Sequence, residues 1–170
     1  MRQACTFNTF VHYLFIRKAV MFSTIIQPKF GDTDCLGHVT HAALALWFET
    51  ARNPFFRIFV PDLNYKMESF PLIMAHVDYD FVDELFSRHE LEIRTWISHI
   101  GNKSFTVHHQ AWQNGRLCVE GSVVVVHYDF NTKQSVPLPA DKRKRLKEHL
   151  IGSQKKARPA KEKGAGDDAP

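Results

Sequence analysis

Cysteine is scarce in this chain: its 170 residues include Cys5, Cys35 and Cys118, widely spaced along the sequence. A small, odd number argues against a disulfide scaffold and fits a reducing cytosol. Paired cysteines with the spacing of zinc ligands are also missing. Cys35 directly follows Asp34, and we interpret it as a small residue in a tight turn rather than a nucleophile. The sequence therefore predicts neither a metal site nor a cofactor.

Long hydrophobic runs are missing as well, since no apolar stretch approaches the about 20 residues of a membrane helix. Residues 1–20 are rich in aromatic side chains, but polar residues interrupt them and their Arg17-Lys18 pair comes last. A signal peptide would place its charge first. Met21 begins a segment typical of a first strand. We therefore interpret residues 1–20 as an extension upstream of the true start, residues 21–150 as the folded domain and residues 151–170 as a disordered basic tail.

The body of the chain lacks an excess of basic charge. Residues 21–140 carry a net charge of −4, whereas residues 1–20 carry +3 and residues 141–170 carry +5. A nucleic-acid-binding protein would need its basic charge organised over a folded face. The charge pattern therefore argues against a nucleic-acid partner, and the hydropathy argues against a membrane span.

Hydrophobic periodicity and turn signals divide the chain into one long helix followed by antiparallel strands. Gly101-Asn102 and Asn114-Gly115 are hairpin turns, which leave no room for helices between strands. Pro54 is expected to end or kink the helix, whose nearly continuous apolar surface predicts burial all round. The expected strands are 22–30, 71–86, 89–100, 103–112 and 116–130, and the expected helices are 41–53 and 141–150. This order predicts an α+β fold in which an antiparallel sheet wraps around a long central helix.

A polar loop carrying Asp32 and Asp34 runs directly into this helix, for which Thr40 is the expected N-cap. A carboxylate beside the free N–H groups of a helix start supplies a base or nucleophile together with an oxyanion site. An aspartate in this position is also typical of a turn or cap. His38 and His41 lie three apart beside the aspartates, but no third residue has convincing spacing for a metal ligand. Spacing alone leaves the catalytic and the turn interpretations open.

The segment GDTDCLGHVTHAALALWFETAR, residues 31–52, resembles the D-x-D, G-H-V and E-x-A-R pattern of hotdog-fold acyl-CoA thioesterases of the 4-hydroxybenzoyl-CoA thioesterase type. The resemblance covers residues 22–150, including the closing VVVVHYD. It implies a hotdog fold, an acyl-CoA substrate and a homodimer or homotetramer with active sites at subunit interfaces. It also implies that Asp34 carries the chemistry, that the backbone N–H of His41 polarises the thioester carbonyl, and that Glu49 lies near the site.

Further residues are expected to bind substrate. Gly37 and His38 belong to the same loop as Asp34, and Lys103 and Ser104 follow a hairpin turn where they suit the phosphates of coenzyme A. Weaker candidates for the phosphates are Arg88 and Arg116.

Two other functions remain open. One is a non-catalytic acyl-binding hotdog protein. The other is a hotdog hydratase or dehydratase, which resembles a pattern with Asp and His five apart and Pro between, whereas Asp34 and His38 are four apart without Pro. The acyl group, the choice between coenzyme A and an acyl carrier protein, and the role of Asp34 as base or nucleophile are left open.

Overall fold

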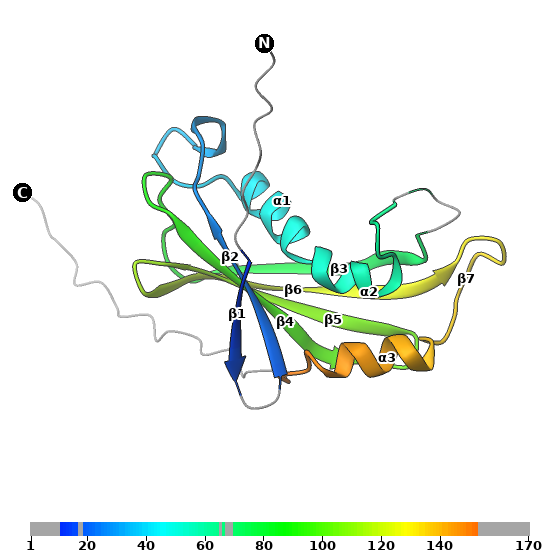
Figure 1. The fold of residues 1–170 in the computed structure, drawn as a ribbon. Coiled ribbons are helices and arrows are strands. Elements are labelled where there is room, and N and C mark those ends of the chain that lie inside the picture. The colour runs from blue at the N-terminus through cyan, green and yellow to red at the C-terminus, as the bar shows by residue number, and fades with distance from the viewer. Residues whose placement is uncertain (1–10, 17–18, 65, 67–69, 153–170) are drawn as a thin grey trace, which may run out of the picture.

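The structure is a computed structural model that describes residues 11–16, 19–64, 66 and 70–152 (Figure 1). The predicted disordered tail comprised residues 151–170, of which residues 153–170 lie outside the described residues. Residues 151 and 152 are described, and the N–H of Ile151 donates to the carbonyl of Ile97 at 3.0 Å. The elements are strands β1 (Val11–Ile16), β2 (Ala19–Ile26), β3 (Leu72–Phe81), β4 (Leu91–Ile100), β5 (Ser104–Gln113), β6 (Arg116–Asp129) and β7 (Gln134–Ser135), helices α1 (His41–Ala51), α2 (Asn53–Phe59) and α3 (Ala140–Lys147), and a 3₁₀ turn, η1 (Phe30–Asp32).

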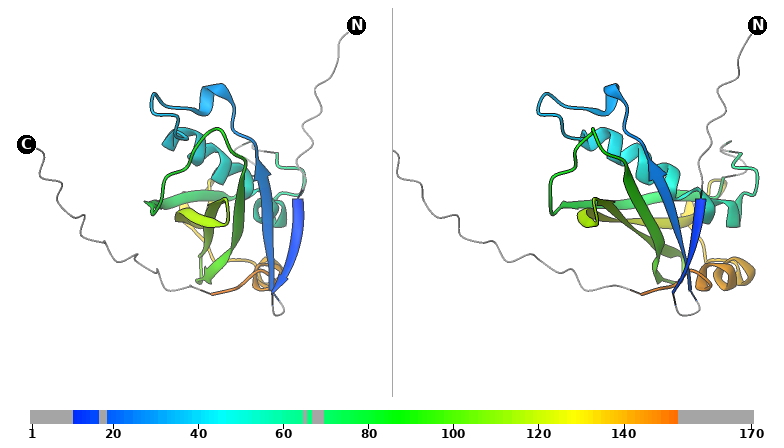
Figure 2. Two further views of the ribbon diagram at one scale, coloured as in Figure 1. Left: turned by 90° about the vertical axis from the view of Figure 1, so that its left-hand side faces the viewer. Right: turned by 60° about the vertical axis from the view of Figure 1, so that its left-hand side comes forward.

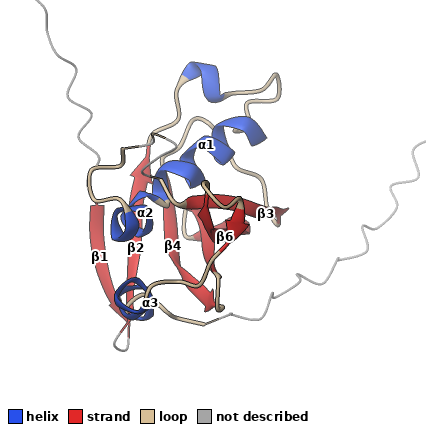
Figure 3. Cartoon of the chain, turned by 90° about the vertical axis from the view of Figure 1, so that its right-hand side faces the viewer, coloured by secondary structure: helices blue, strands red, loops and turns tan. Residues whose placement is uncertain are grey.

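The strands form one antiparallel sheet with the order β1-β2-β4-β5-β6-β3, and β7 pairs with the end of β6. Helix α1 lies across one face of this curved sheet (Figure 2). Helices α2 and α3 lie further along, toward the end of the sheet where β4 finishes (Figures 1 and 3). This arrangement confirms the predicted α+β class and the sheet wrapped around a central helix.

Both predicted hairpin turns are present. The N–H of Gly101 donates to the carbonyl of Ser104 at 2.8 Å and closes the turn between β4 and β5. Asn114 and Gly115 have φ angles of 51° and 76°, the left-handed pair that a two-residue turn with the right-handed sheet twist requires. Asn and Gly adopt this conformation at low cost, so this turn sets the register of β5 on β6.

The core consists of two apolar groups on the α1 side of the sheet. Beneath α1, the fully buried Phe48 stacks on His109 with ring centroids 4.7 Å apart and meets Tyr79 edge-on at 5.4 Å. Beneath α2 and α3, a second group includes Phe55, Phe105 and other buried residues (Phe22, Phe56, Ile58, Leu72, Ile97, Val107, Val123, Val125, Leu138 and Leu146). These side chains alternate along the strands because successive strand residues face opposite sides of the sheet.

Several predicted boundaries were wrong. The helix ends at Ala51 rather than at residue 53, and it is followed by a second helix, α2, that the sequence did not predict. Pro54 lies in the first turn of α2, where its missing N–H costs nothing, so it ends one helix and begins the next. The first strand ends at Ile26, and β3 ends at Phe81 rather than continuing to residue 86.

Two further differences concern the surface and the start of the chain. Helix α1 is not buried all round, because the Leu46 side chain is 63% exposed. An apolar helix surface predicts that its residues are buried, but it does not indicate whether they are buried by the same chain or by another. Strand β1 pairs with β2 although residues 1–20 were interpreted as an upstream extension. Whether the native protein begins at Met21 stays a prediction. None of the described helices is long and apolar enough to cross a membrane.

Candidate active site

The loop before α1 folds back on itself through backbone hydrogen bonds. The N–H of Thr40 donates to the carbonyl of Asp32 at 2.8 Å, and the N–H of Asp34 donates to the carbonyl of His38 at 2.9 Å. These two bonds make a short hairpin, in which Asp32 lies opposite Thr40 at the start of α1 and Asp34 lies opposite His38, two residues further along the loop. The Asp32 carboxylate instead accepts a hydrogen bond from the N–H of Lys29 at 2.7 Å, which makes it a turn residue.

The Asp34 carboxylate is held by the backbone that surrounds it. Its Oδ1 atom accepts hydrogen bonds from the N–H of Leu36 at 2.8 Å and the N–H of His38 at 2.9 Å. Gly37 has a φ of +82°, the left-handed conformation that allows the chain to wrap around the carboxylate. The hydrogen bond from the His38 N–H, with smaller help from Leu36, lowers the pKa of Asp34 below its ordinary value of 3.8. Asp34 is therefore ionised at neutral pH.

The start of α1 leaves backbone donors available. The side chain of Thr40 accepts from the N–H of Ala43 at 3.2 Å, which confirms the predicted N-cap, and the first intrahelical donor is Leu44. The N–H groups of His41 and Ala42 precede these bonds and have no carbonyl in the helix to reach. They carry the positive end of the helix dipole, so they suit an oxygen that becomes negative during reaction.

His38 lies between two carboxylates. Its Nδ1 atom is 3.8 Å from Oδ2 of Asp34, and its Nε2 atom is 3.7 Å from Oε1 of Glu84. These separations are too long for hydrogen bonds but short enough for ionic attraction when the ring is protonated. Asp34 and His38 line an open cleft of about 420 Å³, whose other residues are Val39 and the segment 81–85 at the end of β3.

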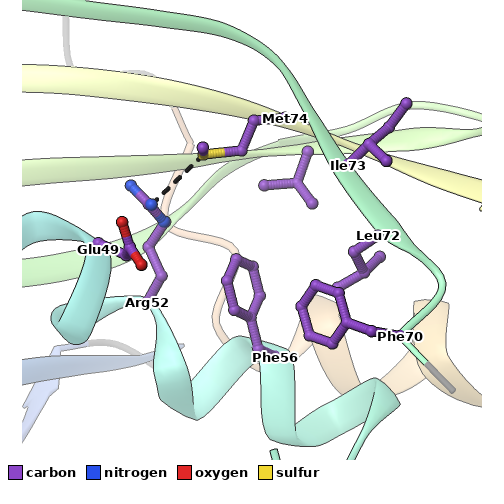
Figure 4. Close-up of a pocket in the computed structure, with 8 residues that line it drawn as sticks. Glu49, Arg52, Phe56, Phe70, Leu72, Ile73 and Met74 are labelled. Atoms are coloured by element: carbon purple, nitrogen blue, oxygen red, sulfur yellow. Dashed lines mark hydrogen bonds between the residues drawn. The ribbon is translucent and has the colours of Figure 1, made fainter. Parts of the chain in front are cut away.

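Glu49 and Arg52 lie at the other end of α1, about 12 Å and about 17 Å from its start at 1.5 Å per residue. Glu49 is exposed, whereas Arg52 is 3% exposed and points its guanidinium at the sulfur of Met74, with Nη2 to Sδ at 3.4 Å (Figure 4). Their spacing of three residues predicts that Glu49 and Arg52 can pair on the helix surface, but no ion pair joins these two described residues. The burial of Arg52 was missed, because it depends on β3, which is remote in the sequence.

Comparison with known proteins agrees with this fold and geometry. Residues 28–146 match the thioesterase-like superfamily. The chain belongs to this superfamily. A predicted thioesterase from Bacillus stearothermophilus is 32% identical, with a TM-score of 0.74, over 79% of this chain and 99% of that one. A thioesterase from Thermus thermophilus, solved with coenzyme A and Zn, is 25% identical, with a TM-score of 0.64, over 73% of this chain and 95% of that one. The uncharacterized Bacillus subtilis (strain 168) protein YsmA is 25% identical over 118 residues, which cover 68% of this chain and 78% of YsmA.

Membership of the thioesterase-like superfamily confirms the resemblance to hotdog thioesterases and identifies the protein as a thioester hydrolase. The superfamily match begins at residue 28 and so includes Asp34, the start of α1 and Glu49. Within the described part of the chain, no group of three or more His, Cys, Asp or Glu side chains is arranged to hold a metal ion. Of the free thiols, Cys35 is exposed in the loop and Cys118 is buried.

The residues predicted to bind the phosphates of coenzyme A lie at opposite ends of the sheet. Lys103 and Ser104 lie at the turn after β4, about 30 Å from the beginning of that strand, and the structure does not bring them together with Asp34 in one protomer. Arg88 and Arg116 lie at the Asp34 end. The Arg88 guanidinium stacks 4.6 Å from the ring of Phe86, and Arg116 pairs with Asp83, which lines the cleft, at 3.2 Å.

Proposed function

We propose that the protein hydrolyses acyl-CoA thioesters, with Asp34 as the catalytic carboxylate and the N–H groups of His41 and Ala42 as the oxyanion site. One observation carries this proposal. An ionised carboxylate, fixed by two backbone N–H groups and open to a cleft, lies in the loop that leads into α1, where the N–H groups of His41 and Ala42 have no hydrogen-bond partner among the described residues. The superfamily membership supplies the reaction class, and this geometry supplies the residues.

Two routes use the same groups. As a general base, Asp34 takes a proton from water while the water oxygen bonds to the thioester carbon. As a nucleophile, Asp34 bonds to that carbon itself, and water then hydrolyses the anhydride. In both routes the carbonyl oxygen becomes negative and is stabilised by the helix N–H groups, the C–S bond breaks, and the thiolate of coenzyme A leaves and takes up a proton. The thiolate is a good leaving group, so no strong acid is required.

The two routes differ in where a labelled oxygen goes. In a single turnover in H₂¹⁸O with enzyme in excess, a general base leaves all of the label in the product acid. An anhydride opened by water at the aspartyl carbon leaves label in the Asp34 side chain. Mass spectrometry of the peptide containing Asp34 distinguishes these outcomes.

Replacing Asp34 by Asn tests the proposed role of the carboxylate. The amide oxygen of Asn accepts the same N–H groups of Leu36 and His38, so the fold of the loop is retained while the charge is lost. We expect kcat to fall about 10²- to 10⁴-fold, the usual contribution of a positioned base. Asp32→Asn is the matched control, because Asp32 holds a turn through an oxygen that the amide also provides. Equal activity in the Asp34 variant and the wild type would refute the proposal.

A panel of acyl thioesters separates the alternative functions. Thiol release from acyl-CoAs indicates hydrolysis, whereas a change in enoyl absorbance without thiol release indicates a hydratase or dehydratase. Binding without either change indicates an acyl-binding protein. Parallel reactions with acyl carrier protein thioesters identify the carrier.

The proposed active enzyme is a homodimer formed through β3. This strand is an edge of the sheet and pairs with β6 on one side. Met74, Val77 and Phe81 on β3 are 53%, 40% and 58% exposed, and they supply apolar surface along this edge. An open edge beside an apolar patch is typical of an interface between subunits.

Two-fold pairing of the β3 edges gives a continuous sheet and sets the two α1 helices side by side in opposite directions. The Glu49 end of one helix then lies next to the beginning of the partner's helix. The Lys103 end of one protomer lies at the same side as the partner's catalytic loop. Within this dimer, Glu49, Lys103 and Ser104 approach a site built around Asp34 of the other subunit, which a single chain does not achieve. A homotetramer is a pair of such dimers.

A further inference from the structure

A second pocket lies at the end of α1, away from the proposed catalytic loop. Its volume is about 210 Å³, and it opens between the α1–α2 junction and the edge strand β3 (Figure 4). The polar end is formed by Glu49 and Arg52. The remainder is apolar and is lined by Phe56, Phe70, Leu72, Ile73, Met74 and Val125.

Arg52 is an unusual residue for such a lining. It is almost completely buried, and its Nε atom is buried without a hydrogen-bond partner among the described residues. Its Nη2 atom donates to the thioether sulfur of Met74, a weak acceptor. The guanidinium carbon lies 5.9 Å from the ring centre of Phe56. Burial lowers the pKa of Arg52, although the nearby Tyr79 and Glu49 oppose this effect.

A buried guanidinium normally faces a carboxylate or several strong acceptors, because removing its charge from water is costly. Arg52 has Tyr79 as an oxygen partner, yet Glu49 remains exposed, and within the described part of the chain it forms no ion pair with Arg52. The guanidinium carries five donors in a fixed plane, and the one on Nε is unused by the described residues. Arg52, one of the two polar residues of the lining, therefore carries a desolvated donor at the end of an otherwise apolar cavity.

We propose that Arg52 makes this pocket selective for acyl groups that carry an oxygen acceptor, a hydroxyl or a carboxylate, at the end remote from the thioester. The inference rests on the proposed thioesterase function and on the proposed dimer, in which this pocket lies near the start of the partner's α1. The aromatic and aliphatic lining accepts the methylene groups of the chain. Nε of Arg52 is enclosed in the free protein, so the side chain turns toward the terminal oxygen and then donates a hydrogen bond to it, whereas an unsubstituted chain leaves this donor unpaired.

The two oxygen groups differ in how they meet Glu49. A hydroxyl accepts from Arg52 and donates to the Glu49 carboxylate at the same time, whereas a carboxylate brings a second negative charge toward Glu49. Hexanoyl-CoA, omega-hydroxyhexanoyl-CoA and adipoyl-CoA have the same carbon chain and end in a methyl, a hydroxyl and a carboxylate. Together they identify which oxygen group the pocket accepts.

The experiment compares kcat/KM for these three thioesters in the full-length wild type, Arg52→Met and Arg57→Met. We expect the wild type to prefer one or both oxygenated chains over hexanoyl-CoA by about 10- to 100-fold, as for hydrogen bonds to a charged group. The ratio falls to about one in Arg52→Met. The ratio is unchanged in Arg57→Met, because Arg57 is exposed on α2 and donates to the carbonyl of Pro61.

A second measurement separates this inference from the proposed function. Calorimetric titration with non-hydrolysable thioethers, S-hexyl-CoA, S-(6-hydroxyhexyl)-CoA and S-(5-carboxypentyl)-CoA, reports the same preference without any turnover, and only the remote end group differs among them. If no thioester is hydrolysed, the proposed function fails, and the titration still decides the role of Arg52. Equal binding of all three thioethers by the wild type, or a preference that persists in Arg52→Met, overturns the inference.

Stability gives a further discrimination. Methionine fills the space of the arginine stem and removes an unsatisfied buried donor, so Arg52→Met is expected to unfold at the same temperature as wild type or higher. A lower unfolding temperature or weakened dimer together with unchanged acyl preference means that Arg52 serves the fold or the interface, and it overturns the inference. Where Arg52→Met fails to fold, Arg52→Gln retains an amide donor of shorter reach and is tested by the same titration for a reduced preference.

Discussion

The backbone N–H of His38 donates to Oδ1 of Asp34 at 2.9 Å, while the imidazole of the same residue lies 3.8 Å from Oδ2. One residue thus holds the acid through its main chain and approaches its other oxygen with its side chain. The backbone bond exists whatever the side chain is. The orientation of Asp34 therefore depends on the shape of the loop more than on the identity of residue 38.

The first prediction concerns the pH dependence of hydrolysis. The N–H of His38 lowers the pKa of Asp34, so the acid limb of kcat/KM is expected below 3.8, the ordinary value. Activity persists above that limb and is lost as pH falls through the lowered pKa, because only the carboxylate reacts. Brief pH jumps with rapid mixing measure this limb before the protein unfolds. An acid limb well above 3.8 would show that another group controls the reaction.

The second prediction concerns Gly37 in the loop. A Cβ atom at this position meets nothing within 4 Å, so Gly37→Ala has space, but its φ of +82° strains any residue with a side chain. We expect about 1–2 kcal/mol of lost stability and a larger loss of kcat, because relief of the strain moves the N–H groups away from Asp34. Gly31→Ala is the control, because that position is also open but has no left-handed φ. Similar kinetics for the two variants would contradict the link between loop shape and catalysis.

The third prediction concerns assembly. Val77→Lys places a charge in the apolar patch on β3 and is expected to convert the proposed dimer into monomers with much lower activity. Sedimentation velocity measures the mass, and activity is followed over the same range of concentration. Ile25→Lys, on β2, changes a residue of similar exposure outside the patch and should leave both unchanged. A wild type that sediments as a monomer, or a fully active monomeric variant, would contradict the interface.

The fourth prediction concerns His109, which is fully buried between Phe48 and the sheet with its Nδ1 atom 3.0 Å from the hydroxyl of Thr95. Burial, with smaller contributions from Arg52 and His108, holds the pKa of His109 well below the ordinary 6.5. The unfolded chain therefore binds a proton that the folded chain does not, and stability falls as pH decreases from about 6.5 toward the lowered pKa. Urea unfolding at several pH values in this range should show that the stability of His109→Gln depends less steeply on pH than that of the wild type. Parallel slopes would mean that His109 takes up its proton in the folded state.

Local sequence features predicted much of the fold. The left-handed pair Asn114 and Gly115 and the turn after β4 were recognisable because two-residue hairpins have strict backbone requirements. Thr40 was recognisable as a cap because its side-chain oxygen can accept a hydrogen bond from a free N–H at the start of the helix. Asp34 and the helix start were found together because they are neighbours in sequence. The role of Asp34 in catalysis stays a prediction.

The features that were missed depend on contacts between distant segments. Leu46 was expected to be buried, because the helix pattern does not reveal that no other part of the described chain covers it. Helical spacing predicts that Arg52 can pair with Glu49, yet the guanidinium of Arg52 contacts Met74 on β3 instead. Lys103 was placed near the substrate from its turn, but nothing in a turn indicates at which end of the sheet it lies. Sequence periodicity indicates which face of an element is apolar, but the topology of the fold determines which other segment packs against that face.

The open edge of β3 has a consequence for newly made chains. If β3 joins two subunits as proposed, each new chain carries an unpaired edge strand with an apolar surface until it binds a second copy, and exposed strands of other proteins compete for this edge. The rate at which two copies associate depends on the square of their concentration, whereas the rate at which a single chain folds does not depend on concentration. The rate of synthesis therefore governs how long each copy remains vulnerable, and slow production favours misassociation over the productive pair.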